Sequence, residues 1–194
     1  MTKSSHIQLF SSTQKRAENL PIYRVGESGP CWRILSGLVR LAHSHLDESG
    51  SFAGIAYAGD LLGSEVLIHG TYLYDAWPLG DVKLEPCPEL RPDMLLLNLL
   101  SAHRRAEDLL ALRIGEAEQR IRLLLQFLSS KSHTEDNMMF MPSLRDMAEM
   151  TALNHETVCR IISRLRRLGQ LQRFGRHNGV MELVIKQPHP LHAA

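Results

Sequence analysis

Hydrophobic and polar positions change their spacing along this chain. Between residues 21 and 88, short apolar runs alternate with Gly, Pro, Asp and Ser, which is the pattern of a small antiparallel sheet. The predicted strands are 38–42, 51–57 and 82–85, and a polar connection joins the first two. After residue 91 the apolar residues recur every three or four positions, which predicts helices.

The first predicted helix opens at Pro92, a residue suited to the first turn. Leucine and alanine then recur at spacings of four and three, as in a coiled-coil seam. The pattern predicts a dimerisation seam, although a helix packed on its own sheet would show it too. Gly115 interrupts the pattern and Glu116 and Glu118 restart it, so we expect the hinge between two domains here. The predicted seam residues are Leu95, Leu99, Ala102, Ala106 and Leu109.

Two short helices are predicted beyond the hinge, joined by a tight turn at 151–153. The first covers 143–150, where Ser143 and Asp146 have the spacing of a capping box. The second covers 154–165 and starts at Asn154, a good N-cap residue. Two such helices predict a helix-turn-helix, whose second helix enters the DNA major groove. Its predicted inward-facing residues are Val158, Ile161, Ile162 and Leu165.

The outward face of the second helix carries the chemistry expected of base recognition. Glu156 can accept a hydrogen bond from cytosine N4, and Arg160 can donate two to guanine O6 and N7. Six arginines lie between residues 160 and 176 with no acidic residue among them, a footprint suited to phosphates. The predicted base-reading residues are His155, Glu156, Cys159 and Arg160. The predicted phosphate contacts are Ser143, Thr157, Ser163, Arg164, Arg173 and Arg176.

These motifs resemble those of the cyclic AMP receptor protein/FNR (Crp/Fnr) superfamily of bacterial transcription regulators. The resemblance covers roughly residues 20–184. It rests on the run 156–161 (Glu-Thr-Val-Cys-Arg-Ile), on a wing-like segment at 173–179 with Asn178-Gly179 at its turn, and on barrel-like motifs at 23–27, 32–41 and 59–63.

The resemblance implies an α+β fold. Its N-terminal part would be an antiparallel jelly-roll β-barrel of the cyclic-nucleotide-binding type, followed by a long dimerisation helix and a C-terminal winged helix-turn-helix. It also implies a homodimer on an inverted-repeat site with half-sites of the TTGA or TGTGA type, with RNA polymerase as a partner. The expected boundaries are 1–20 for an N-terminal segment, 21–91 for the barrel, 92–115 for the helix and hinge, 116–187 for the DNA-binding domain and 188–194 for a tail.

The segment 63–77 departs from the pattern of relatives that bind cyclic AMP. In those relatives the resemblance implies a Gly-Glu pair that meets the ribose and an Arg-Ser pair that holds the phosphate. Here Ser64 separates Gly63 from Glu65. Tyr74 and Asp75 stand at the positions of the Arg-Ser pair, and the acidic Asp75 would repel a phosphate. The sequence therefore predicts no control by cyclic AMP and an unknown effector. The candidate pocket residues are Gly63, Glu65, Tyr74 and Asp75.

The cysteines and histidines indicate no resident cofactor or metal. The three cysteines are widely spaced without a CxxC motif, which predicts reduced thiols and no cysteine-only metal centre. A haem or metal sensor built from His43, His45 and either Cys31 or His69 stays open as an alternative. So does a redox role for Cys159.

Composition excludes several classes of protein. The net charge is +1, and no apolar run approaches the roughly 18 residues of a membrane span. The first 20 residues lack the apolar segment of a signal peptide, so a cytoplasmic protein without a membrane partner is expected. No nucleophile–base constellation suggests an enzyme. The prediction is a sequence-specific transcription regulator. The competing classes are an enzyme or metal-handling protein that uses the barrel, and a non-specific architectural DNA-binding protein.

Overall fold

The computed structural model describes residues 8–11, 20–44, 51–89, 91–132, 138–177 and 180–185 of the 194-residue chain. The chain divides into two compact units between Ala111 and Leu112. Among the helices described, none is long and apolar enough to cross a membrane.

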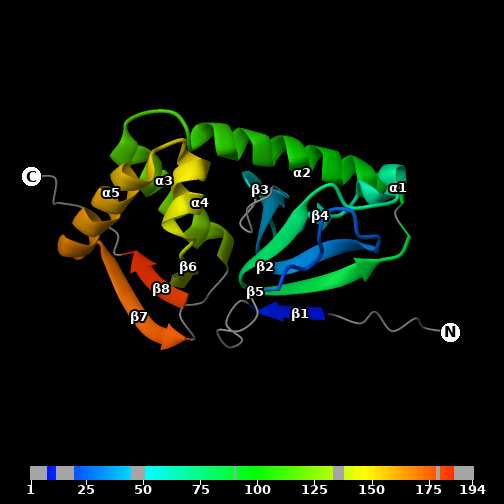
Figure 1. Cartoon of the computed structure of the whole chain (residues 1–194), viewed down its shortest axis with the longest axis horizontal. Helices are drawn as coiled ribbons and strands as arrows, with labels where there is room; N and C mark the ends of the chain where they lie inside the picture. The colour runs from blue at the N-terminus through cyan, green and yellow to red at the C-terminus, as the bar shows by residue number, and fades with distance from the viewer. Residues whose placement is uncertain are drawn as a thin grey trace, which may run out of the picture. The chain divides into compact units, whose positions relative to one another are not determined.

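The first unit is an antiparallel sheet built on two long strands (Figure 1). The strand order is β1-β5-β2-β3, and β4 pairs with β2 beside this path. The predicted strands 38–42, 51–57 and 82–85 are present, and two of them are parts of longer strands. The strands are β1 (Gln8–Ser11), β2 (Cys31–His43), β3 (Ser51–Tyr57), β4 (Leu61–Leu62) and β5 (Asp75–Cys87).

The pairing of β2 with β5 is interrupted by two register shifts on either side of Ser36. Gly37 lies there with a φ of +94°, and a Cβ at this position would overlap the backbone carbonyl of Asp81. Only glycine tolerates this combination of conformation and close approach.

The predicted closed barrel is wrong for the part of the chain that the structure describes. β1 and β3 end the strand order and do not pair with each other, so the sheet stays open. β4 has two residues and β1 has four, which supply few of the ladder hydrogen bonds that barrel closure requires.

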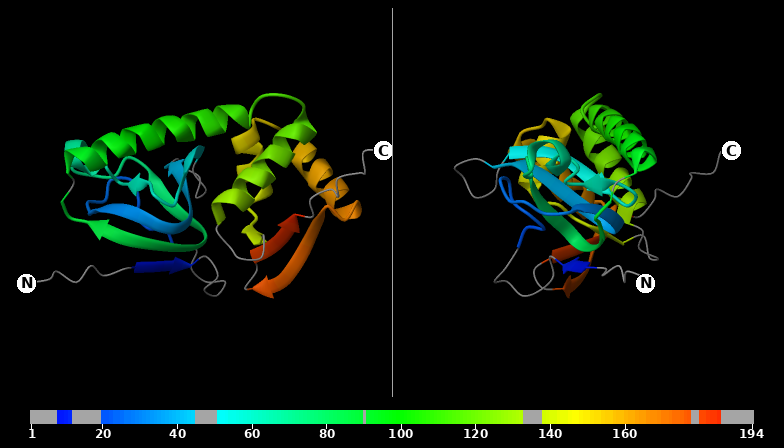
Figure 2. Two further views of the ribbon diagram at one scale, coloured as in Figure 1. Left: turned by 180° about the vertical axis from the view of Figure 1, so that it is seen from behind. Right: turned by 90° about the vertical axis from the view of Figure 1, so that its right-hand side faces the viewer.

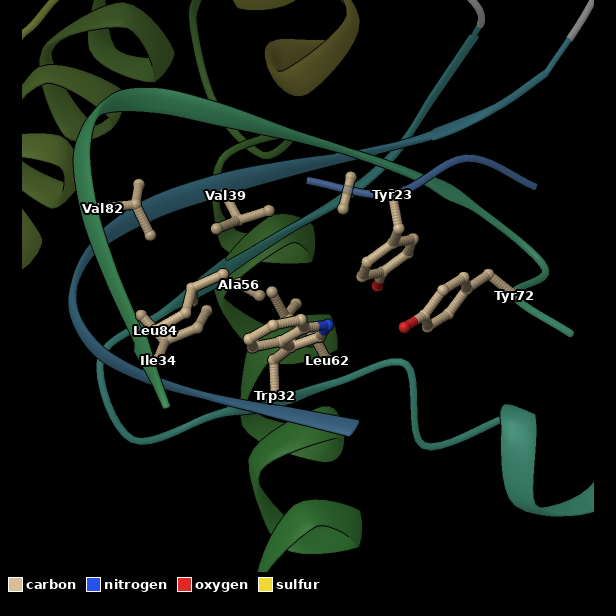
Figure 3. Packing of buried hydrophobic residues seen from close by; sticks show 10 residues of the cluster. Tyr23, Trp32, Ile34, Val39, Ala56, Leu62, Tyr72, Val82 and Leu84 are labelled. Atoms are coloured by element: carbon tan, nitrogen blue, oxygen red, sulfur yellow. The ribbon is translucent and has the colours of Figure 1, made fainter. Parts of the chain in front are cut away.

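A cluster of apolar side chains forms the core of the first unit (Figure 3). Trp32, Ile34 and Val39 come from β2, whereas Val82 and Leu84 come from β5. Burial of these side chains is the main favourable contribution to the stability of the unit.

Two helices complete the first unit. α1 (Val66–His69) is a single turn, whereas α2 (Pro92–Ala111) has 20 residues and begins at the predicted Pro92. α2 runs along the sheet and contacts β3 (Figures 1 and 2). None of its residues is fully buried.

The second unit packs three helices with a three-stranded antiparallel sheet of order β6-β8-β7 (Figure 1). Gly115, with a φ of +93°, precedes the first of these helices, which starts where the acidic restart predicted it. The buried side chains of the second unit include Ile121 and Leu128 from that helix, and Met147 and Ile162 from the two helices that follow. The elements are α3 (Ala117–Ser132), β6 (Met138–Phe140), α4 (Leu144–Thr151), α5 (His155–Arg167), β7 (Leu171–His177) and β8 (Val180–Ile185).

Candidate DNA interface

The two short helices of the second unit begin at the predicted capping residues. Ser143 Oγ accepts the Asp146 backbone N–H at 3.0 Å and donates to the Asp146 carboxylate at 2.8 Å. Asn154 Oδ1 accepts the Thr157 backbone N–H at 2.7 Å. Both caps are confirmed, and each satisfies a backbone donor that the helix itself leaves unpaired. Ala152, at a φ of +52°, ends α4 and makes the turn between the helices.

α5 has one apolar and one polar face, as predicted. Val158, Ile161, Ile162 and Leu165 are buried in the second unit. The candidate base-reading residues are all exposed, as are Ser163 and Arg164, and Thr157 is half-buried. The structure therefore presents one continuous polar strip that begins at the N-cap of α5: His155, Glu156, Cys159, Arg160, Ser163 and Arg164.

The charges on this strip are not equivalent. Arg164 pairs with Glu118 of α3 at 3.2 Å, and Arg122 approaches the same carboxylate at 2.7 Å. The Arg122 hydrogen bond, with the positive charge of Arg164, lowers the pKa of Glu118. Within the described part of the chain, Arg160 has no such ion pair. Arg160 is therefore the more available of the two cations.

Two arginines that the sequence did not single out hold the C-terminal end of α4. Arg113 donates to the backbone carbonyls of Glu149 and Met150 at 3.3 and 3.4 Å. Arg120 donates to the carbonyls of Thr151 at 3.3 Å and Gly115 at 2.8 Å. Cations at a helix C-terminus satisfy its last carbonyls and oppose its dipole. They thereby fix α4, and the turn that follows it, to the start of α3. No local pattern pointed to them, since their partners on α4 lie more than 30 residues away.

The other proposed phosphate contacts lie on elements near α5. Ser143 is the cap of α4 described above. Arg173 and Arg176 belong to β7, where Arg173 pairs in register with Leu183 of β8. The predicted turn Asn178-Gly179 lies outside the described residues.

The candidate effector residues of the first unit are occupied by the fold itself. Asp75 is buried, and its carboxylate accepts the Val25 backbone N–H at 2.8 Å. Glu65 accepts the Leu73 backbone N–H at 3.4 Å, and the ring of Tyr74 lies 4.9 Å from that of His43. Asp75 therefore has a structural role as an acceptor at the start of β5.

Tyr23 and Tyr72 lie next to each other in the first unit (Figure 3), and Tyr72 fills the space beside Gly63. The ring of Tyr72 stacks on Tyr23 with a centroid separation of 3.7 Å. Its hydroxyl donates to the Pro30 carbonyl at 2.7 Å. A Cβ at Gly29 would overlap the Tyr72 hydroxyl and a Cβ at Gly63 would overlap its ring, so this side chain is closely enclosed by backbone.

The structure does not bring Cys31 and His43 together in the metal set that the sequence left open as an alternative. Cys31 and His43 are the first and last residues of β2, which separates them by the full length of a 13-residue strand. A strand rises about 3.3 Å per residue, so no single ion can touch both side chains. His45 lies outside the described residues. The separation of Cys31 from His43 excludes the version of the alternative that uses Cys31, whereas the version with His69 stays a prediction. Spacing in the sequence does not show which residues are at the same end of a strand.

Comparison with known proteins identifies the family. No family model matches the chain. The transcriptional regulator SdrP of Thermus thermophilus is 32% identical over 164 residues, covering 76% of this chain and 78% of SdrP. This chain belongs to the Crp/Fnr family of transcription regulators.

Solved structures agree with the family assignment. A CRP-family transcriptional regulator from Thermus thermophilus has a TM-score of 0.68 at 21% identity, covering 92% of this chain and 91% of that one. A CRP/FNR-family regulator from the same organism has a TM-score of 0.61 at 26% identity, covering 92% and 93%. The predicted family is confirmed, and this Crp/Fnr protein is a transcription regulator with a cyclic-nucleotide-binding-like domain.

Proposed function

We propose that this Crp/Fnr protein is a homodimer that recognises an inverted-repeat DNA site and inserts α5 of each copy into a major groove. The observation that carries the proposal is the exposed polar strip of α5, set on a buried apolar face and starting at a capped N-terminus. In a winged helix-turn-helix this end of the second helix meets the base edges.

Glu156 and Arg160 are the proposed centre of base recognition. They lie four residues apart and therefore share one side of the helix. Glu156 accepts from a cytosine N4, and Arg160 donates to a guanine O6 and N7, which gives half-sites with a GA/TC core. His155 and Cys159 flank them. Phosphates would be held by Ser143, Thr157, Ser163, Arg164, Arg173 and Arg176.

The proposed dimer rests on the way α2 distributes its side chains, with polar residues toward its own unit and leucines toward the outside. Polar side chains of α2 attach it to the rest of the first unit: Asn98 donates to Ser64 Oγ at 3.0 Å, Arg105 pairs with Asp60 at 2.9 Å, and Asp108 accepts from the Tyr57 hydroxyl at 3.0 Å. Its leucines are exposed, apart from the half-buried Leu109. A helix in this setting ordinarily buries its apolar side, so the leucines require another apolar surface.

A second copy of α2 supplies that surface. The residues opposite the polar side recur at spacings of three and four, as in a two-stranded coiled coil. Leu96, Leu99 and Leu110 are 60, 67 and 61% exposed. Of the predicted seam, Leu99 and Ala106 lie on this row, whereas Ala102 and Leu109 are half-buried and flank it with Leu95. The refined row is Leu96, Leu99, His103, Ala106 and Leu110.

We propose that cyclic AMP neither binds nor controls this protein. Its phosphate would meet the Asp75 carboxylate where a cation is needed, and burying an uncompensated charge costs several kcal/mol. The Tyr23–Tyr72 stack also fills space beside Gly63. Titration calorimetry should show no heat of binding, and operator affinity should not respond to the nucleotide. Micromolar binding with tighter operator association would contradict this part of the proposal.

Replacement of Arg160 tests base recognition directly. Arg160→Ala should weaken binding to the preferred site by about 1–3 kcal/mol and relax the preference at one base pair of each half-site. Arg167→Ala removes an equal charge from the other end of α5 and is the matched control, with preference retained. An equal loss on every DNA sequence would make Arg160 a phosphate contact instead.

Contact with RNA polymerase stays a prediction.

A further inference from the structure

Two cysteines that are 56 positions apart in the sequence are cross-strand partners in the first unit. Cys31 is the first residue of β2 and Cys87 is the last residue of β5, and the register pairs them directly. Directly opposed residues of antiparallel strands have Cβ atoms about 4.5–5.5 Å apart. A disulfide needs about 3.5–4.5 Å between Cβ atoms, so a small local approach suffices.

The position of the pair makes that approach feasible. Both residues are at the ends of their strands, so only the last rung of the β2–β5 ladder has to move. The Cys31 thiol donates to the Gly63 carbonyl at 3.3 Å, and the Cys87 thiol lies 3.9 Å from the Glu85 carbonyl. Neither is a strong hydrogen bond, since a thiol is a weak donor.

We propose that Cys31 and Cys87 are a reversible dithiol–disulfide site that is oxidised by small-molecule disulfides. Cys87 is half-buried, whereas Cys31 is only 4% exposed. The Cys87 thiolate therefore attacks the oxidant first, forming a mixed disulfide and releasing one thiolate. Cys31 then loses its proton and attacks Cys87 Sγ, which releases the second thiolate. The two protein thiols lose two protons and two electrons, and the oxidant is reduced to two thiols.

The surroundings set the rate of this reaction. Burial, followed by the negative charge of Glu65, raises the pKa of Cys31. Burial also raises the pKa of Cys87, although the positive charge of Arg33 opposes the effect. Because the thiolate is the attacking species, oxidation is slow near neutral pH and accelerates as pH rises. The pair therefore responds slowly, and oxidation near neutral pH requires sustained exposure to the oxidant.

Cys159 provides the contrast. It is exposed on α5, and the second unit contains no other cysteine with which it could pair. A test in the full-length Cys159→Ser protein removes this competing thiol without altering the pair.

The experiment is peptide mapping after oxidation. The folded Cys159→Ser protein is incubated with oxidised glutathione at a series of pH values, alkylated under denaturing conditions and digested with trypsin. Cleavage after Arg33 and Lys83 places the two cysteines in separate peptides. We expect these peptides to be joined by a disulfide, without bound glutathione, faster at higher pH and reversibly with dithiothreitol.

A second variant defines the order of attack. Cys31→Ser, combined with Cys159→Ser, should stop at a glutathione adduct on Cys87. The proposal is overturned if, in the Cys159→Ser protein, glutathione persists on Cys87 while Cys31 is alkylated, or if both cysteines remain alkylated after prolonged oxidation.

Discussion

α2 and α5 present opposite solutions to the placement of apolar residues on a helix. α5 buries Val158, Ile161 and Ile162 and exposes its charges, as a helix on the surface of a domain is expected to do. α2 directs Asn98, Arg105 and Asp108 to the rest of the first unit and exposes all its leucines except Leu109. The first arrangement suits a polyanion, and the second suits another apolar surface.

The difference separates the two proposed partners by their chemistry. Arginines on an exposed strip gain affinity by displacing counterions from DNA. Exposed leucines gain stability by leaving water, at about 25 cal/mol per Å² of apolar area buried. Mutations on one helix should therefore leave the partner of the other helix unaffected, except where DNA binding requires the dimer.

The largest expected effect comes from charges on the outward row of α2. Leu99→Asp combined with Leu110→Asp would bury unpaired carboxylates at the seam. Sedimentation should show monomers, and operator binding should be lost with them. Leu97→Asp, at a residue that is 61% exposed but off the row, is the control and should stay dimeric. A dimeric double variant would mean that another surface joins the copies.

The polar side of α2 should show a smaller but still large effect on folding. Asp60 is 2% exposed and is paired with Arg105, so Arg105→Ala leaves a buried carboxylate without its cation. The free energy of unfolding in urea should fall by about 3–5 kcal/mol. Arg104→Ala, at an exposed neighbour, should change it little. Equal effects of both variants would show that the ion pair adds nothing to the attachment of α2.

The ion pair between Arg164 of α5 and Glu118 of α3 should weaken the contact of Arg164 with DNA. Glu118→Gln removes the charge that Arg164 contacts at 3.2 Å. We expect tighter binding to specific and non-specific DNA alike, with a steeper dependence on salt. Glu149→Gln, at a residue paired with Arg145 on α4, is the comparison variant. An unchanged salt dependence in Glu118→Gln would remove Arg164 from the phosphate contacts.

The smallest expected effect is a pH dependence at the α2–sheet contact. Burial and the hydrogen bond to Asp108 raise the pKa of Tyr57 from 10.0 to about 12. Because the pKa of Tyr57 is raised in the folded state, its protonated hydroxyl contributes to the free energy of unfolding. This contribution is complete below pH 10 and is lost as pH approaches 12. Tyr57→Phe should therefore flatten the decline of unfolding free energy in this window. Identical pH profiles for the two proteins would show that this hydroxyl does not titrate with folding.

How much the sequence could predict differs between the same two helices. The residues that define α5, its cap and its buried face lie within 12 positions of one another, and a local pattern was sufficient. For α2 the period indicated a helix but not which side meets the sheet, because that depends on partners such as Asp60 and Ser64. The pairing of Cys31 with Cys87 and the clamp of Arg113 and Arg120 on α4 were missed for the same reason.

The open sheet shows a second limit of prediction from the sequence. The alternating pattern located β3 and parts of β2 and β5, but the register shifts beside Gly37 and the short β4 depend on how strands meet. The barrel followed from the family resemblance and not from any residue pattern. Sites built by long-range pairing therefore required the structure, whereas the candidate DNA strip did not.

The central claim is that α5 reads a specific inverted repeat. Its most direct test is selection of duplexes from a random-sequence pool by the full-length protein, with the bound fraction sequenced at physiological salt. We predict enrichment of one inverted repeat with GA/TC half-sites, spaced by about one helical turn. Recovery of DNA without sequence enrichment would contradict the claim and identify a non-specific DNA-binding protein.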